Sequence, residues 1–206
     1  MQKLSVALLF AIGCSLVACK GHSKKILVYA NSNIQADATN TNLTVGDGTT
    51  HREQELSFVT GDPVTLNVTT GSGKLTLSAP EDGLYIANLK NDTVIGSMQH
   101  VGADADSRIT QDALKAKLDS LQQLVNNQNV NAANKNYYLL PNTIAKISGE
   151  SKAKVFGPFT TIPGSFDAGS VPEIYKFYSI KEIRDIIAKL SAMTGEKKPE
   201  AAADKK

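Results

Sequence analysis

The sequence predicts an α+β protein, in which an antiparallel β-sandwich is followed by a smaller α+β region with two amphipathic helices and a hairpin. Two patterns support this prediction. Over residues 25–101, short runs of alternating apolar and polar residues are separated by turn-forming residues, which is typical of a sandwich. Over residues 102–195, apolar residues recur three or four positions apart, which is the period of a helix. We therefore expect a β-sandwich domain over 25–101 and an α+β region over 102–195.

The clearest predicted strands form a hairpin. Residues 64–68 (VTLNV) show the period-two alternation of a half-buried strand, residues 70–73 (TGSG) supply a turn, and residues 74–77 (KLTL) resume the alternation. A second hairpin is predicted between residues 84–89 and 94–98 across the polar residues that separate them. Two further strands are expected from their apolar residues, over 25–30 (KILVYA) and 54–59 (QELSFV).

Residues 81–87 (EDGLYIA) resemble the tyrosine corner of immunoglobulin-like sandwiches. In that motif the tyrosine hydroxyl bonds back to upstream backbone at the corner before a core strand. The resemblance implies an immunoglobulin-like fold for residues 25–101, with Tyr85 at the corner and Ala87 in place of the second cysteine. The chain has no tryptophan, so the usual strand C core residue is missing. A plain turn before a strand is the alternative interpretation.

A first helix is predicted over residues 109–128, with Asp106 or Ser107 as its N-cap. Its apolar stripe has 4-3-4 spacing and consists of Leu114, Leu118, Leu121 and Val125, with Leu124 beside it. The stripe spans fewer than two heptads, so packing on its own domain is favoured over a coiled coil. Beyond it, residues 137–148 and 153–159 are predicted to pair as a hairpin, with prolines that confine both strands to edges or ends.

The last predicted helix has the strongest end signals in the chain. Ser179 and Glu182 form a capping box, in which the serine accepts from the N3 amide and the glutamate reaches back to the cap. A stripe of isoleucines and Leu190 follows, and Gly195 is expected at C′. Residues 196–206 (EKKPEAAADKK) are charged, rich in alanine and without core residues, which predicts a disordered tail.

The N-terminal segment has the composition of an export signal. Lys3 gives a short positive region, and residues 4–16 (LSVALLFAIGCSL) give an apolar run too short to span a membrane as a helix. Leu16-Val17-Ala18-Cys19 follows, and this motif resembles the lipobox of bacterial lipoproteins. The resemblance implies a signal peptide over 1–18, cleavage before Cys19 and lipid attachment to Cys19. An ordinary signal peptide, with an incidental cysteine, is the alternative.

Lipidation would define how the chain is held and which chemistry it lacks. The only other cysteine, Cys14, would leave with the signal peptide, so no free thiol or disulfide would remain. Several acyl chains on one cysteine would anchor the protein stably, whereas a single chain binds only marginally. The linker over 19–24 is short, because Lys20 to Lys24 span at most about 17 Å when extended. Lysine after Cys19, rather than an acidic residue, favours the periplasmic face of the outer membrane in a Gram-negative host.

Charge gives no indication of a nucleic-acid partner. The formal net charge is +2, and the basic residues are spread along the chain except near the two ends. Nucleic-acid binders usually carry a basic face with interleaved aromatic residues, and this pattern is missing here. The lysines after Cys19 either attract anionic headgroups or simply solvate the linker. We therefore expect the membrane, together with a protein or glycan of the envelope, as partners.

The histidines His22, His51 and His100 are the candidates for acid–base chemistry. No Gly-x-Ser-x-Gly, His-Glu-x-x-His or P-loop motif accompanies them. Residues 51–55 (HREQE) contain metal-ligating types, but charge alternation on an exposed strand explains them better. Residues 104–106 (DAD) resemble the start of a calcium loop without the rest of it, so helix capping is favoured. The sequence predicts no catalytic residue, no cofactor and no metal ligand.

Two short matches resemble the Asp-Ser/Thr-apolar sites at which some Gram-negative bacteria O-glycosylate exported proteins. They centre on Thr93 and Ser120, and Thr93 is the better candidate because it falls in a predicted turn rather than within a helix. Together, these features predict a lipid-anchored envelope lipoprotein that acts as a non-catalytic binding or structural module. The alternatives are an accessory subunit of an envelope transport or secretion assembly and, less favoured, a hydrolase with a dispersed site at His51 or His100.

Overall fold

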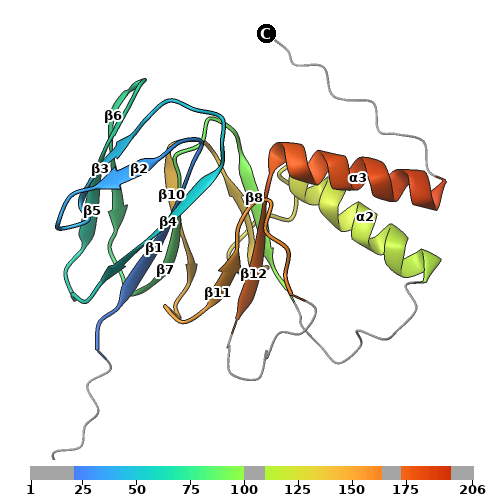
Figure 1. The fold of residues 1–206 in the computed structure, drawn as a ribbon. Helices are drawn as coiled ribbons and strands as arrows, with labels where there is room; N and C mark the ends of the chain where they lie inside the picture. The colour runs from blue at the N-terminus through green and yellow to red at the C-terminus, as the bar shows by residue number, and fades with distance from the viewer. Residues whose placement is uncertain (1–20, 100–109, 164–172, 196–206) are drawn as a thin grey trace, which may run out of the picture.

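The structure is a computed structural model that describes residues 21–99, 110–163 and 173–195 (Figure 1). It is mostly β-sheet, with three four-stranded sheets and two helices among these residues. We name the sheets by position. The outer sheet has the order β2-β3-β5-β6, the central sheet β10-β7-β1-β4, and the helix-facing sheet β11-β12-β8-β9. The strands of the outer sheet are β2 (Ile34–Ala36), β3 (Asn42–Val45), β5 (Val64–Thr70) and β6 (Gly73–Ala79).

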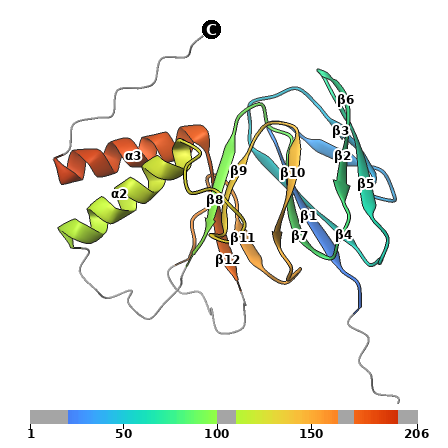
Figure 2. The same ribbon diagram turned by 180° about the vertical axis from the view of Figure 1, so that it is seen from behind.

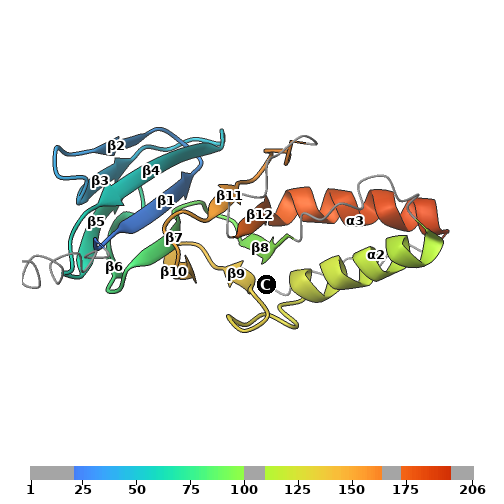
Figure 3. The same cartoon turned by 90° about the horizontal axis from the view of Figure 1, so that it is seen from below.

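The central sheet contains β1 (Lys24–Ala30), β4 (Arg52–Phe58), β7 (Gly83–Asn88) and β10 (Thr143–Ser148). The helix-facing sheet contains β8 (Val94–Met98), β9 (Asn136–Leu139), β11 (Lys154–Phe156) and β12 (Ile174–Ser179). The helices are α2 (Gln111–Val125) and α3 (Ile180–Thr194), which pack against each other. From one side to the other, the layers are outer sheet, central sheet, helix-facing sheet and helix pair (Figure 3).

The inner strands of the central sheet, β1 and β7, are covered on both faces. Alternate residues of β1, such as Ile26 and Val28, pack against the outer sheet, while Tyr29 packs against the helix-facing sheet. Every residue of β7 is buried. A strand covered on both sides needs apolar residues at every position rather than at alternate ones. This explains why KILVYA and LYIA are nearly continuous apolar runs, whereas β5, in a sheet with one covered face, alternates.

The structure confirms the prediction of a sandwich-like β fold with two helices. The prediction that the sandwich is antiparallel is wrong. Each sheet is mixed, because it contains one parallel pair: β1 with β7, β3 with β5, and β11 with β12. The sheets also combine both predicted parts of the chain. β10 joins the central sheet beside β7, and β9 and β12 flank β8. The predicted boundary at residue 101 therefore does not coincide with a division between sheets.

Of the predicted hairpins, the one joining β5 and β6 is confirmed. The prediction of a hairpin between residues 84–89 and 94–98 is wrong, because β7 lies in the central sheet and β8 in the helix-facing sheet. The hairpin between 137–148 and 153–159 is wrong for the same reason, since β10 and β11 belong to different sheets (Figure 2). In each case a short polar connection crosses between layers instead of reversing within one. Strand β12 was not predicted, because its sequence IYKFYS lies directly against the cap of α3.

The last helix follows its predicted signals. Ser179 Oγ accepts from the Glu182 amide at 3.1 Å, and Gly195 ends the helix in the left-handed region at φ 72°. Glu182 does not reach back to the cap, because its carboxylate instead accepts from the Phe159 amide at 3.0 Å. The other helix is capped by Thr110, not by the predicted Asp106 or Ser107.

Several predictions fall on residues outside those that the structure describes. They are the signal peptide over 1–18, Cys19, His100, the acidic pair at 104–106 and the tail over 196–206. The structure has no bearing on them.

Candidate functional site

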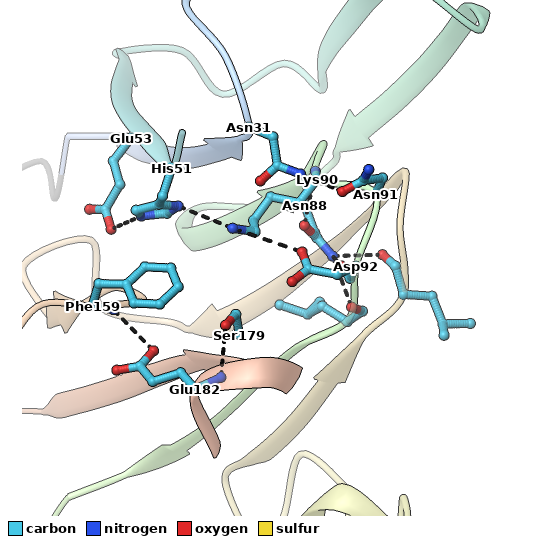
Figure 4. A network of polar contacts seen from close by, with 12 residues as sticks. Asn31, His51, Glu53, Asn88, Lys90, Asn91, Asp92, Phe159, Ser179 and Glu182 are labelled. Carbon is cyan, nitrogen blue, oxygen red and sulfur yellow. Dashed lines mark hydrogen bonds and ion pairs between the residues drawn. The ribbon is translucent and has the colours of Figure 1, made fainter. Parts of the chain in front are cut away.

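The buried polar side chain with the most hydrogen bonds in the described fold is Asn88, at the end of β7. It is fully buried, and its Nδ2 donates to the carbonyls of Asp92 at 2.9 Å, Leu139 at 3.0 Å and Leu140 at 3.2 Å. Its Oδ1 accepts from the Lys90 amide at 3.1 Å (Figure 4). One amide side chain therefore ties the β7–β8 connection to the β9–β10 connection, which satisfies backbone groups that would otherwise be buried without partners.

These two connections form one wall of a hollow that we call the distal cup. It lies where β1 ends, and its cavity volume is about 240 Å³. The other walls are the loop after β3 and the β5–β6 turn. The lining is mostly polar or glycine and consists of Asn31, Val45, Gly46, Asp47, Gly48, Thr70, Gly71, Ser72, Leu89, Lys90, Asn91 and Asn142.

The polar side chains of the distal cup are held in place by their neighbours. Asn31 Nδ2 donates to Asn91 Oδ1, and the Asn142 amide donates to the Asn88 carbonyl at 2.7 Å. Thr70 Oγ1 lies 2.9 Å from Ser72 Oγ across the turn. Asn142 adopts φ 60°, a left-handed conformation that asparagine tolerates better than most residues. The cup is thus built from ordered turns rather than from free side chains.

Lys90 joins the distal cup to a second polar cluster, which we call the Lys90 network. The lysine is 3% exposed, and its Nζ lies 3.4 Å from His51 Nδ1 and 3.8 Å from Asp92 Oδ1. Burial lowers the pKa of Lys90, and the nearby carboxylates of Asp92, Glu182 and Glu53 oppose this shift. The amine is therefore turned inward, toward groups that compensate its charge.

Aromatic rings contact both His51 and Lys90 in the Lys90 network. The His51 ring packs edge-on against Tyr29 and Phe159, with centroids 5.7 Å and 5.8 Å apart. Lys90 Nζ lies 5.7 Å from the centroid of the Phe159 ring. Phe159 sits at φ 63°, which is strained for an aromatic residue, and its amide donates to Glu182 (Figure 4).

A second buried lysine continues the same network toward α3. Lys176 Nζ donates to the carbonyls of Gly157 at 2.6 Å and Phe177 at 2.8 Å, and it lies 3.6 Å from Glu182 Oε1. Burial lowers the pKa of Lys176, while Glu182 raises it. The network thus connects the central sheet, the helix-facing sheet and the start of α3, and its charges are paired. This arrangement holds the layers together.

The hydrogen bonds of His51 go to an acid, Glu53, and to the amine of Lys90, and not to a serine or cysteine. Its Nε2 lies 2.8 Å from Glu53 Oε1, which is within hydrogen-bond reach. Its other ring nitrogen faces the Lys90 amine, at the position where a triad would hold a hydroxyl. Across the ranges described, no group of three or more His, Cys, Asp or Glu residues could hold a metal ion.

A second hollow, of about 290 Å³, lies near the starts of β9 and β12 and the end of β10. At its wall the Glu173 carboxylate accepts from Lys135, Ser148 and Tyr175. These hydrogen bonds lower the pKa of Glu173 against the opposing effect of its burial. Its polar groups are therefore already bonded to one another.

The predicted glycosylation residue Thr93 does not lie in a hairpin turn. It sits half-buried in the connection from the central sheet to β8, and its carbonyl accepts from the Ile180 amide at 3.0 Å. Ser120 is exposed within α2.

Sequence reasoning did not find the residues of the distal cup. The one available signal was Asn88, which ends an apolar run. An amide side chain at the end of a buried strand has to find hydrogen-bond partners inside the protein. Lys90 and Asn91 looked like ordinary turn residues, and Asn31, Asp47 and Asn142 are far apart in the chain.

Comparison of the chain with known protein families, with curated proteins and with solved structures gives no match. Among the described helices, none is long and apolar enough to cross a membrane.

Proposed function

We propose that this protein is a lipid-anchored binding module of the bacterial cell envelope, attached through Cys19 and without catalytic activity of its own. The observation that carries the proposal is the lipobox-like motif Leu16-Val17-Ala18-Cys19, followed almost at once by the first strand, which begins at Lys24. A globular body that starts this close to an acylated cysteine would be held against the bilayer.

Polar contacts at the start of the body support a very short tether. Lys24 is buried, and its Nζ donates to the Thr60 carbonyl at 2.7 Å and to Asp82 Oδ1 at 3.2 Å. His22 Nδ1 lies 2.7 Å from Asp82 Oδ2. The hydrogen bond from His22 is the main reason that the pKa of Asp82 is lowered, and Lys24 contributes to the same shift. The chain is thus held from His22 onward, so Cys19 lies at most about 11 Å from it when the chain between them is extended.

The finer proposal, an immunoglobulin-like sandwich over residues 25–101, rests on the corner at Tyr85. Its hydroxyl donates to the Glu81 carbonyl at 2.9 Å and accepts from the Glu81 amide at 3.1 Å, as a tyrosine corner requires. An immunoglobulin-like arrangement would also have to include β10, which joins the central sheet from beyond residue 101.

Absence of catalysis is proposed from the Lys90 network. Both ring nitrogens of His51 already face charged groups, Glu53 and Lys90. An outer-membrane position on the periplasmic face, and O-glycosylation at Thr93, remain proposals from the sequence.

The anchor is tested by metabolic labelling with an alkyne-bearing palmitate analogue in a Gram-negative host. The unaltered chain should be labelled, and Cys19→Ser should lose the label completely. Cys14→Ser is the matched control, because it removes the other cysteine of the chain and should keep the label. Labelling that survives Cys19→Ser would refute the anchor. Density-gradient separation of the two membranes, with protease added to whole cells, then tests the membrane and its face.

A further inference from the structure

We propose that the distal cup is a binding site for a neutral, hydroxyl-rich saccharide. The cup is concave, and its volume of about 240 Å³ lies just below the range of about 300–1,000 Å³ typical of small-molecule sites. It therefore fits a small ring, such as one residue of a glycan chain, rather than a nucleotide or a folded protein surface.

The hydrogen-bonding groups of the cup suit hydroxyls. Asn31, Asn91 and Asn142 bring three amides to one hollow, and each amide both donates and accepts. Asp47 adds an acceptor, and the hydroxyls of Thr70 and Ser72 do both. A sugar hydroxyl also donates and accepts, so mixed amide and hydroxyl groups match it better than groups of one kind.

Charge and polarity disfavour other ligand classes. The one lysine of the lining, Lys90, directs its amine to His51 and Asp92, so it is not presented to an anion. Asp47 is the only acidic residue of the lining, and a hard cation prefers several oxygen ligands with more than one carboxylate. The two apolar side chains, Val45 and Leu89, are both buried. A neutral polar ligand remains.

Glycines let the walls of the cup pack closely against one another. A Cβ at Gly48 would lie 2.7 Å from the Asn31 carbonyl oxygen, and a Cβ at Gly71 would overlap the Asp47 carboxylate. Since Asn88 fixes the loops beneath, little ordering is needed when a ligand binds.

The position of the cup connects it to the proposed function, on which this step rests. β1 runs from Lys24, near Cys19, to Ala30, and Asn31 of the cup follows directly (Figure 1). Seven residues of strand span roughly 23 Å. A chain anchored at Cys19 would therefore present the cup away from its own membrane, toward glycans of the envelope or of the surroundings.

The test is binding to the purified full chain in non-ionic detergent, by calorimetry and by NMR of asparagine side-chain amides. The probes are chitotetraose, representing N-acetylated envelope glycans, and maltotetraose and cellotetraose, representing other polysaccharides. At least one should bind and shift the side-chain amides of Asn31, Asn91 and Asn142. Which probe binds distinguishes the source of the glycan.

Asp47→Ala and Asn91→Ala should each weaken that binding about tenfold. Both residues are exposed, and each substitution removes hydrogen bonds to the ligand. Asn67→Ala, at an exposed position on β5 outside the cup, should leave it unchanged. Binding of none of the three saccharides would overturn the proposal. So would saccharide binding that Asp47→Ala and Asn91→Ala both leave intact, or binding of inorganic phosphate at the cup. Since binding is measured in detergent, failure of the unaltered chain to be labelled at Cys19 would refute the anchor and would leave this binding result unaffected.

Discussion

Asn88 offers the sharpest test of how the layers are held together. Asn88→Ala removes an amide whose two hydrogens are shared among three carbonyls and whose oxygen accepts from the Lys90 amide. We count this as about three effective hydrogen bonds. Each contributes roughly 0.5–1.5 kcal/mol net, and buried groups left without partners place the total toward the upper end. The expected loss in the free energy of unfolding is about 2–4 kcal/mol, a large part of a typical stability of about 5–15 kcal/mol.

The assay is urea and thermal unfolding of the full chain in non-ionic detergent. A loss of that size corresponds to a fall in Tm of roughly 4–16 °C for a protein of about 150–250 residues. Asn88→Asp is a second variant. It keeps the oxygen that accepts from Lys90 but turns a carboxylate oxygen toward three carbonyls, so at pH 7 it should destabilise at least as much as alanine.

The matched control is Asn67→Ala, which removes from β5 an exposed amide with a single hydrogen bond, to Asn42 Oδ1 at 3.2 Å, and should lower stability by no more than about 1 kcal/mol. Hydrogen exchange of the Lys90 amide adds a local measurement, because this amide should exchange faster once its acceptor is gone. If Asn88→Ala is as stable as the unaltered chain, or Asn88→Asp is more stable than Asn88→Ala, then Asn88 does not hold the two connections together.

Four further changes test separate parts of the fold. Gly96→Ala would drive a Cβ into the Phe177 ring and should cost about 1–3 kcal/mol in urea unfolding, a cost that Phe177→Leu in the same chain should partly relieve. Tyr85→Phe removes both hydrogen bonds of the corner and should lower the unfolding free energy by about 1–3 kcal/mol. Tyr29→Phe should be neutral or stabilising by the same measurement, because the Tyr29 hydroxyl is buried without a hydrogen-bond partner; a loss above about 1 kcal/mol would contradict this. Hydrogen bonds from its turn lower the pKa of Asp37 to about 2 from its ordinary 3.8, so the stability it contributes is present above about pH 4 and is lost as pH falls toward 2. The stability difference between Asp37→Ala and the unaltered chain should accordingly shrink between pH 5 and pH 2.5, and a constant difference would show that Asp37 does not act through its charge.

Local signals in the sequence were reliable where the physical cause is itself local. The alternation in residues 64–77 predicted the β5–β6 hairpin, because a tight turn fixes which strands pair. Ser179 and Gly195 predicted both ends of α3, because a cap depends on backbone groups a few residues away. Glu182 shows the limit of this reasoning, since a partner in a distant loop, the Phe159 amide, replaced the local one.

Partners of the inner strands depended on contacts that no local pattern encodes. β7 and β8 look like a hairpin along the chain, but β7 is nearly uniformly apolar because it is covered on both faces. That composition is compatible with many neighbours, so packing of whole layers selects β1 and β10. The same holds for the distal cup, whose amides come from three separate connections that only the layered arrangement brings together.

By itself, therefore, the sequence determined the β-rich class, the β5–β6 hairpin and the ends of the last helix, because each depends on neighbours in the chain. Tertiary structure alone decided the mixed sheets, the four layers, the inward-facing lysines and the cup. These arise because covering both faces of the inner strands β1 and β7 requires strands from the whole chain, and the polar groups at the ends of those strands must then find partners across layers.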